Sequence, residues 1–245
     1  MKVEGFALRL RPRSGWESAD LGVRLAQHCS ASVYPCLLLA FIPVLLLTLA
    51  CYQASASLAL LFLWWAKPWL DRSVLFVLAR AAFGQATRPL DLWRARGEIW
   101  WRQFWLSWSL RRLSPWRSFT QPVYQLEGLT RAERRQRIAQ LRVGHSGVAL
   151  LMTSAFATVE QVFTVSLMSI ALWFAPRPAQ AQWNLQNLVG MDSQWSGWAS
   201  LLSYAIVLLV LEPMYVAAGF AMYLNRRVEL EAWDVEQEFR RAFVR

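Results

Sequence analysis

The chain has 245 residues, of which 56% are hydrophobic, and carries a formal net charge of +10. This composition excludes an array of soluble domains and favours one all-α integral membrane domain over residues 1–245. The three cysteines, Cys29, Cys36 and Cys51, show no metal-ligand spacing and do not suggest a disulfide framework.

The basic charge is almost entirely arginine, because only Lys2 and Lys67 are lysines among the 26 basic residues. Such charge is typical either of a nucleic-acid surface or of the cytoplasmic flanks of membrane spans. The arginines cluster beside apolar runs, and the 15 tryptophans fit an interfacial aromatic belt. We therefore expect a lipid bilayer as the partner and no nucleic acid.

The first half predicts two spans. Ser14 and Glu17 form a capping-box pattern that predicts an interfacial helix over 14–28. Apolar runs then predict spans at 33–51 and 56–77. The second run contains Lys67 and Asp71, which are four residues apart and can pair on one helix face. Alternatively, Lys67 extends its ammonium group to an interface.

Residues 84–144 form the largest polar segment, which its arginines place in the cytoplasm. Within it, 93–110 has aromatic residues on one side of a helical wheel, the pattern of an amphipathic helix lying in the membrane plane. A base-stacking platform would use similar residues, but the lipid interface is the simpler explanation between two spans. Thr130 and Glu133 form a second capping-box pattern.

The second half predicts two more spans, at 146–175 with Glu160 near its middle and at 199–224 with Glu212 and Pro213. The connection 176–198 contains one basic residue and is expected on the periplasmic side. Residues 226–245 predict a cytoplasmic helix whose narrow apolar stripe suits docking, either on the protein's own basic loop or on a partner. Four spans with both termini in the cytoplasm follow.

The two halves resemble each other. Each has a capped helix, a span, and then an apolar run interrupted by a charged residue and proline: Lys67-Pro68 in the first half and Glu212-Pro213 in the second. Two duplicated hairpins would bring these opposite charges to equivalent depths. We therefore predict that Lys67 and Glu212 pair or share a site. The alternative is that the pattern arose twice by chance.

No catalytic, cofactor-binding or metal-binding motif is present, so no enzyme is predicted. The candidate site is an intramembrane charge cluster of Lys67, Asp71, Glu160 and Glu212, with helix breakers at Pro68 and Pro213. The two glutamates can serve an ion, a proton or a ligand, or they can be structural.

The closing segment EPMYVAAGFAMYLNRRVELEAWDVEQEFRR (212–241) resembles the end of a family of uncharacterised bacterial inner-membrane proteins. Three further stretches extend the likeness: RPRSGWESADLGVRL (11–25), KPWLDRSVLFVLARAAFG (67–84) and RSFTQPVYQLEGL (117–129). More remotely it is similar to glycerophosphodiester phosphodiesterase-type membrane domains, which lack the catalytic barrel. The resemblance implies a multi-pass bacterial inner-membrane protein linked to MoxR-type ATPases and von Willebrand factor A-like proteins.

Two functions are therefore expected. The first is a non-enzymatic inner-membrane scaffold or assembly component that docks protein partners on its cytoplasmic face. The second is a small transporter or lipid-binding protein with a charged site at the bilayer midplane. Candidate docking or structural residues are those of the closing motif: Arg226, Arg227, Glu229, Glu231, Trp233, Asp234, Glu236, Arg240 and Arg241.

Overall fold

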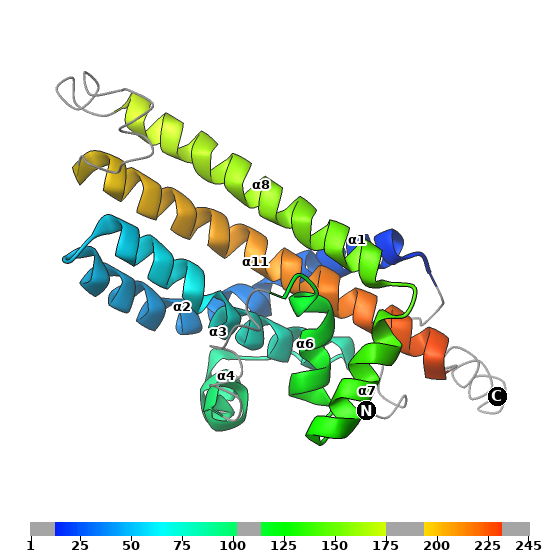
Figure 1. Ribbon diagram of the computed structural model, residues 1–245. Helices are drawn as coiled ribbons and strands as arrows, with labels where there is room; N and C mark the ends of the chain where they lie inside the picture. Colours follow the sequence, from blue (N-terminus) through cyan, green and yellow to red (C-terminus); the bar gives the residue numbers. More distant parts are fainter. Residues whose placement is uncertain (1–12, 102–113, 175–193, 232–245) are drawn as a thin grey trace.

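The computed structural model describes residues 13–101, 114–174 and 194–231, and this part of the chain contains helices and no strand (Figure 1). The elements in chain order are α1 (Gly15–His28), α2 (Ser30–Tyr52), α3 (Ala56–Ala82), α4 (Pro89–Arg94), the π-helical turn η2 (Gly97–Trp101), α6 (Arg117–Leu126), α7 (Arg131–Arg142), α8 (Ser146–Trp173) and α11 (Gln194–Glu231).

Within the described residues, three helices are by length and composition apolar enough to cross a membrane: Ser30–Tyr52, Ser146–Ala171 and Trp195–Glu231. The expected second span, α3, has 27 residues and is also long enough. It differs from the other three because every 18-residue window within it contains Lys67, Asp71 and Arg72. All three of these side chains are buried inside the protein.

The long helices lie side by side around α11 (Figure 1). Helix α8 packs on one side of α11 and α3 packs on another, while α2 pairs with α3. The turn between α2 and α3 meets the start of α11, where the rings of Tyr52 and Trp198 have centroids 4.2 Å apart. We call this end of the bundle the apolar end.

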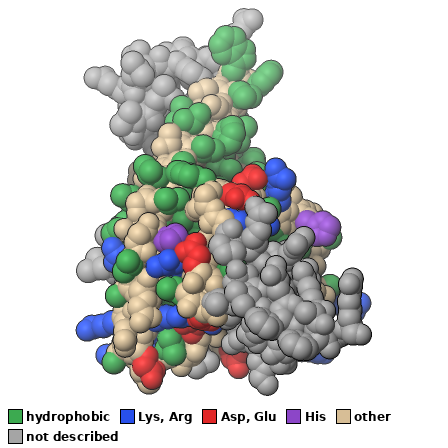
Figure 2. All heavy atoms as spheres, turned by 90° about the vertical axis from the view of Figure 1, so that its right-hand side faces the viewer, with side chains coloured by type: hydrophobic (Ala, Val, Ile, Leu, Met, Phe, Trp, Pro, Cys, Tyr) green, Lys and Arg blue, Asp and Glu red, His purple; other side chains and the backbone are tan. Residues whose placement is uncertain are grey.

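Charged side chains are unevenly distributed along the length of the bundle. The described residues of α2, of 53–66, of 161–174 and of 194–211 contain no charged side chain. Figure 2 shows the same asymmetry, with apolar side chains covering the upper part and charged ones gathered below. The bundle therefore has an apolar end and an opposite end, the basic end, where α6 and α7 lie.

Small residues allow two helices to approach α11 closely. A Cβ atom added to Gly22 of α1 would lie 2.2 Å from the carbonyl oxygen of Ala217. One added to Gly219 would lie 2.4 Å from Cβ of Ser118 in α6. Glycine at both positions thus permits backbone contact that any other residue would block.

Helix α1 begins as expected, with the Ser14 hydroxyl accepting the N–H of Glu17 at 3.2 Å. Its small-residue face packs on α11 through Ser18, Ala19, Gly22 and Ala26, all of which are buried. We expected an interfacial helix over 14–28. In the structure this helix has a protein neighbour along one face.

Three expected boundaries differ from the structure. The expected division between a span ending at 224 and a separate helix beginning at 226 is absent, because α11 continues to Glu231. The last five residues of the expected loop 176–198 belong to α11. The expected helix over 93–110 is interrupted after Arg94. Residues 102–110 of this expected helix lie outside the described residues. Helix α11 continues past 225 because the segment 225–231 packs against α7 and the turn that follows it.

The tryptophans of this interrupted segment pack partly on α3. Trp100 is buried, donates its indole N–H to Ser73 Oγ at 2.9 Å and stacks on Trp69 at 4.9 Å between centroids. Trp101 is 63% exposed, and its ring lies edge-to-face against Trp69 with centroids 6.2 Å apart. The described part of the expected aromatic side therefore packs on α3, with Trp100 buried and Trp101 largely exposed.

Candidate functional site: a charge cluster beside a cavity

Helix α3 contributes two charges one turn apart, Lys67 and Asp71, and α11 contributes Glu212. Both helices continue through the neighbouring prolines, Pro68 and Pro213. Proline at these positions leaves a carbonyl group without its helical donor. The prolines therefore lie within continuous helices, directly beside the charges.

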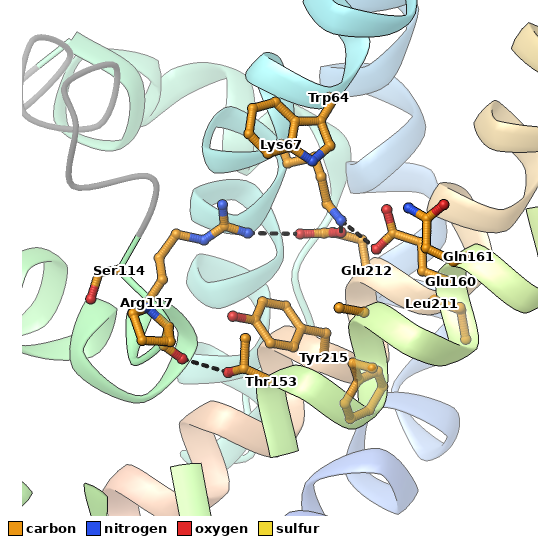
Figure 3. Close-up of a pocket in the computed structure, with 13 residues that line it drawn as sticks. Trp64, Lys67, Ser114, Arg117, Thr153, Glu160, Gln161, Leu211, Glu212 and Tyr215 are labelled. Atoms are coloured by element: carbon orange, nitrogen blue, oxygen red, sulfur yellow. Dashed lines mark hydrogen bonds and ion pairs between the residues drawn. The ribbon is translucent and has the colours of Figure 1, made fainter. Parts of the chain in front are cut away.

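Lys67 lies between two carboxylates (Figure 3). Its Nζ is 2.6 Å from Glu160 Oε2 on α8 and 2.9 Å from Glu212 Oε2 on α11. The pair of Lys67 and Glu212 expected from the likeness of the two halves is therefore present. Lys67 does not extend to an interface, since it is buried at 7% exposure.

Asp71 pairs with an arginine instead of with Lys67. Arg117 Nη2 lies 2.9 Å from Asp71 Oδ2 and 3.3 Å from Glu212 Oε1. Asp71 is fully buried and Glu212 is 2% exposed. Glu212 therefore joins both halves of a five-residue charge cluster, Lys67–Glu160–Glu212–Arg117–Asp71.

The turn before α6 holds Arg117 in place. Thr153 of α8 donates its hydroxyl to the Pro115 carbonyl at 2.6 Å, and the Trp116 indole donates to the Ser146 carbonyl at 2.9 Å. The guanidinium of Arg142 lies 3.7 Å from the centre of the Trp116 ring. These contacts fix the position from which Arg117 reaches the cluster.

A cavity of about 300 Å³ lies against the cluster (Figure 3). Its charged lining is Lys67, Arg117, Glu160 and Glu212, and its polar lining includes Ser114, Thr153 and Gln161. The rest of its wall is apolar or aromatic and comes from α3, α8, α11 and the turn before α6: Trp64, Pro115, Phe156, Ala157, Leu211 and Tyr215.

The described lining of the cavity combines charged, polar and aromatic side chains. Among the described residues, no group of three or more histidine, cysteine, aspartate or glutamate side chains could hold a metal ion. An apolar pocket with a few convergent charged groups is typical of small-molecule sites. The cavity therefore has the chemical character of a small-molecule binding site.

The first part of the closing motif holds the two ends of the described chain together. The Asn225 side chain accepts the N–H of Arg13 at 2.8 Å and donates to the Arg13 carbonyl at 2.9 Å. Arg226 bonds Glu229 at 2.8 Å and the Val143 carbonyl at 3.1 Å. His145 Nε2 also lies 3.4 Å from Glu229.

Other residues of the closing motif form a polar network with the segment 117–142. Tyr223 donates its hydroxyl to Glu127 at 2.5 Å, and Arg227 pairs with Glu231 at 2.6 Å. Arg137 of α7 bonds both Glu127 and Glu231. Arg226, Arg227, Glu229 and Glu231 therefore contact the protein's own loop, whereas Trp233, Asp234, Glu236, Arg240 and Arg241 lie outside the described residues.

Sequence reasoning missed Arg117, because it is one of many arginines in the basic segment. A signal was nevertheless present. The four expected membrane charges comprise one cation and three carboxylates, and buried charges need partners of opposite sign. This imbalance called for a further cation.

Comparison of the chain with protein-family models, with curated proteins and with solved structures finds no match. Any function must therefore be argued from the cluster, the cavity and the arrangement of the helices.

Proposed function

We propose that this protein is a membrane protein that binds a small polar or amphipathic ligand in the cavity beside its charge cluster, as a small transporter or a lipid-binding protein. The observation that carries the proposal is the cavity itself, which joins Lys67, Glu160, Glu212 and Arg117. A purely structural cluster needs no such opening. Ionisable groups inside a membrane usually mark a pathway or binding site.

The proposed topology has four spans, with α3 as the second and both termini in the cytoplasm of a bacterial cell. Its support is the charge asymmetry, since the described residues at the apolar end carry no charge, whereas the arginines gather at the basic end. Burial of Lys67, Asp71 and Arg72 inside the bundle removes the main obstacle to placing α3 in lipid.

Helix geometry supports a cluster inside the hydrocarbon region. At 1.5 Å per residue, Lys67 lies about 17 Å along α3 from its start at the apolar end, and Glu212 lies about 27 Å along α11 from its start. The hydrocarbon core is about 30 Å thick. With the apolar end at one interface, the cluster lies within the core and closer to the cytoplasm.

The topology is tested by single cysteines in a cysteine-free background, at Gln53 and at Gln85, which flank α3 and are both exposed. An impermeant thiol reagent added to intact cells should label Gln53→Cys, whereas Gln85→Cys should react only after the cells are opened. Labelling of both from the same side would contradict a spanning α3.

Ligand binding is tested by filling the cavity. Ala157 lines it and is exposed, so Ala157→Phe should reduce the volume without a clash in the core. Ala155→Phe on the same helix is the matched control, since Ala155 is exposed and does not line the cavity. We expect the small molecules or lipids that co-purify with wild type to be lost from the Ala157 variant alone.

A second candidate function is a scaffold that docks partners on the cytoplasmic side, with a MoxR-type ATPase or a von Willebrand factor A-like protein as the partner that the family resemblance suggests. It is favoured by the internal pairing of the cluster, where each charge has an opposite charge within 3.3 Å. Deleting 232–245 should then abolish partner co-purification while leaving the cavity's ligand in place.

A further inference from the structure

The balance of charge in the cluster restricts what the cavity can accept. Two cations, Lys67 and Arg117, face three carboxylates, Asp71, Glu160 and Glu212. If all five groups are ionised, one negative charge remains. A net charge is costly in a medium of low dielectric constant and favours a bound cation.

An anionic ligand would find no cation without a carboxylate partner in the described lining. Lys67 is shared by Glu160 and Glu212, and Arg117 is shared by Asp71 and Glu212. An incoming phosphate or carboxylate would have to displace one of these carboxylates from its pair. It would then leave a carboxylate buried without its partner, which is strongly unfavourable.

Glu160 is the carboxylate best placed for a ligand. It contacts Lys67 through Oε2, and its side chain is 13% exposed, compared with 2% for Glu212. Figure 3 shows the Glu160 carboxylate at the edge of the cavity, beside Gln161. A cationic group in the cavity can therefore reach Glu160 without breaking either ion pair of Lys67.

The walls also suit a cation. Trp64, Phe156 and Tyr215 line the cavity, and the rings of Phe156 and Tyr215 have centroids 5.7 Å apart in an edge-to-face arrangement. The Tyr215 ring already faces a cation, because Arg117 Cζ lies 5.7 Å from its centroid. Aromatic ring faces attract ammonium groups, and the attraction grows when the site is shielded from water. Carboxylate and aromatic groups together are the chemistry that recognises an organic ammonium ion.

We propose that the cavity binds an organic ammonium group, whose charge lies beside Glu160 and is surrounded by the aromatic wall. The inference rests on the proposed function and specifies its ligand class. The ammonium group can belong to a lipid head group or to a free amine. The cavity opens beside Ala157 on the exposed face of α8, so an attached acyl chain could remain in the bilayer.

The test uses the full chain in nanodiscs that contain equal amounts of phosphatidylethanolamine and phosphatidylglycerol with identical acyl chains. Native mass spectrometry then measures which lipid stays bound. Ethanolamine and inorganic phosphate serve as soluble probes in a thermal-shift assay. The variants are Glu160→Gln, which removes the charge and keeps the shape, with Ala157→Phe and its control Ala155→Phe.

We expect an ammonium-bearing probe to be retained or to stabilise the protein, with binding weakened at least about tenfold by Glu160→Gln and by Ala157→Phe but not by Ala155→Phe. Binding of ethanolamine indicates a free amine or head group, whereas retention of phosphatidylethanolamine alone indicates a lipid-borne ammonium.

Two results overturn the inference, and they differ from failure of the proposed function. Preferential binding of phosphatidylglycerol or phosphate, lost in Ala157→Phe, leaves a ligand site but not an ammonium site. Ammonium binding that is unchanged in Glu160→Gln also contradicts it. If Ala157→Phe changes the binding of no probe and of no co-purified molecule, the cavity binds nothing and both proposals fail. The excess charge of the cluster is then neutralised by a bound proton.

Discussion

Replacing Lys67 with methionine is the perturbation with the largest expected effect on stability. Lys67 is the only cation of the cluster that contacts Glu160, at 2.6 Å, and it also contacts Glu212 at 2.9 Å. Methionine keeps most of the side-chain volume, so the packing around it should change little. The substitution leaves one cation, Arg117, to balance three carboxylates, so the formal net charge of the cluster changes from −1 to −2.

The magnitude follows from breaking a buried ion pair by removing one partner, which costs about 3–5 kcal/mol. Glu212→Gln should cost less, because glutamine can still accept a hydrogen bond from Lys67 and its loss of charge makes the cluster formally neutral. The double variant restores the formal charge of wild type. It should therefore be more stable than Lys67→Met, with a coupling energy of about 0.5–3 kcal/mol.

The assay unfolds wild type, the two single variants and the double variant in bicelles with increasing SDS. Far-ultraviolet circular dichroism monitors the unfolding. Each variant is compared with wild type for the midpoint and the free energy of unfolding. A free energy for Lys67→Met within about 0.5 kcal/mol of wild type, the usual range for an unimportant surface change, would refute the reasoning. So would strict additivity in the double variant.

Three further predictions concern the rest of the bundle. Gly22→Leu should destabilise the protein by at least about 1–3 kcal/mol, because its side chain would meet the Ala217 carbonyl, while Gly147→Ala, with no atom within 4 Å of the added Cβ, should not; the same SDS unfolding measures both. Asn225→Leu should release the Arg13 backbone and expose the start of the chain to limited proteolysis, and an unchanged cleavage pattern would contradict this. Tyr223→Phe should cost about 1–3 kcal/mol, since Glu127 loses its hydroxyl donor, and equal thermal stability would show that the network with α6 and α7 is unimportant.

Much of the fold could be predicted from apolar length alone. The helices α2, α3 and α8 start within three residues of the expected spans because each follows a polar stretch or a turn. The charges of the site were also visible, since Lys67 and Asp71 interrupt the apolar run of α3, and Glu160 and Glu212 interrupt those of α8 and α11. Periodicity and hydropathy are local signals, and they sufficed for these elements.

Tertiary packing determined the features that local signals could not show. The expected last span ends at 224, yet α11 continues, because Arg226 bonds the carbonyl groups of Gln140 and Val143 at the end of α7 and Arg227 lies 3.7 Å from Glu127. The sequence predicts an interfacial helix over 14–28, but the contact of α1 with α11 depends on small residues, to which hydropathy gives little weight. Arg117 could be found only by asking which cation balances three membrane carboxylates.

The most direct measurement of the central claim is whether water reaches the cavity. Cysteine is introduced at Ala157 or at Ala155 of α8 in a cysteine-free background, in membranes or nanodiscs. Each variant is then exposed to a small hydrophilic thiol reagent. The two positions differ by two residues along one helix, so their depths in the bilayer are nearly the same.

A water-accessible binding cavity predicts rapid labelling of Ala157→Cys and slow labelling of Ala155→Cys, with the reaction at 157 slowed by a bound ligand. Equal, slow labelling of both would show a dry cluster, which contradicts the ligand-binding account and leaves the five charges as structural ion pairs.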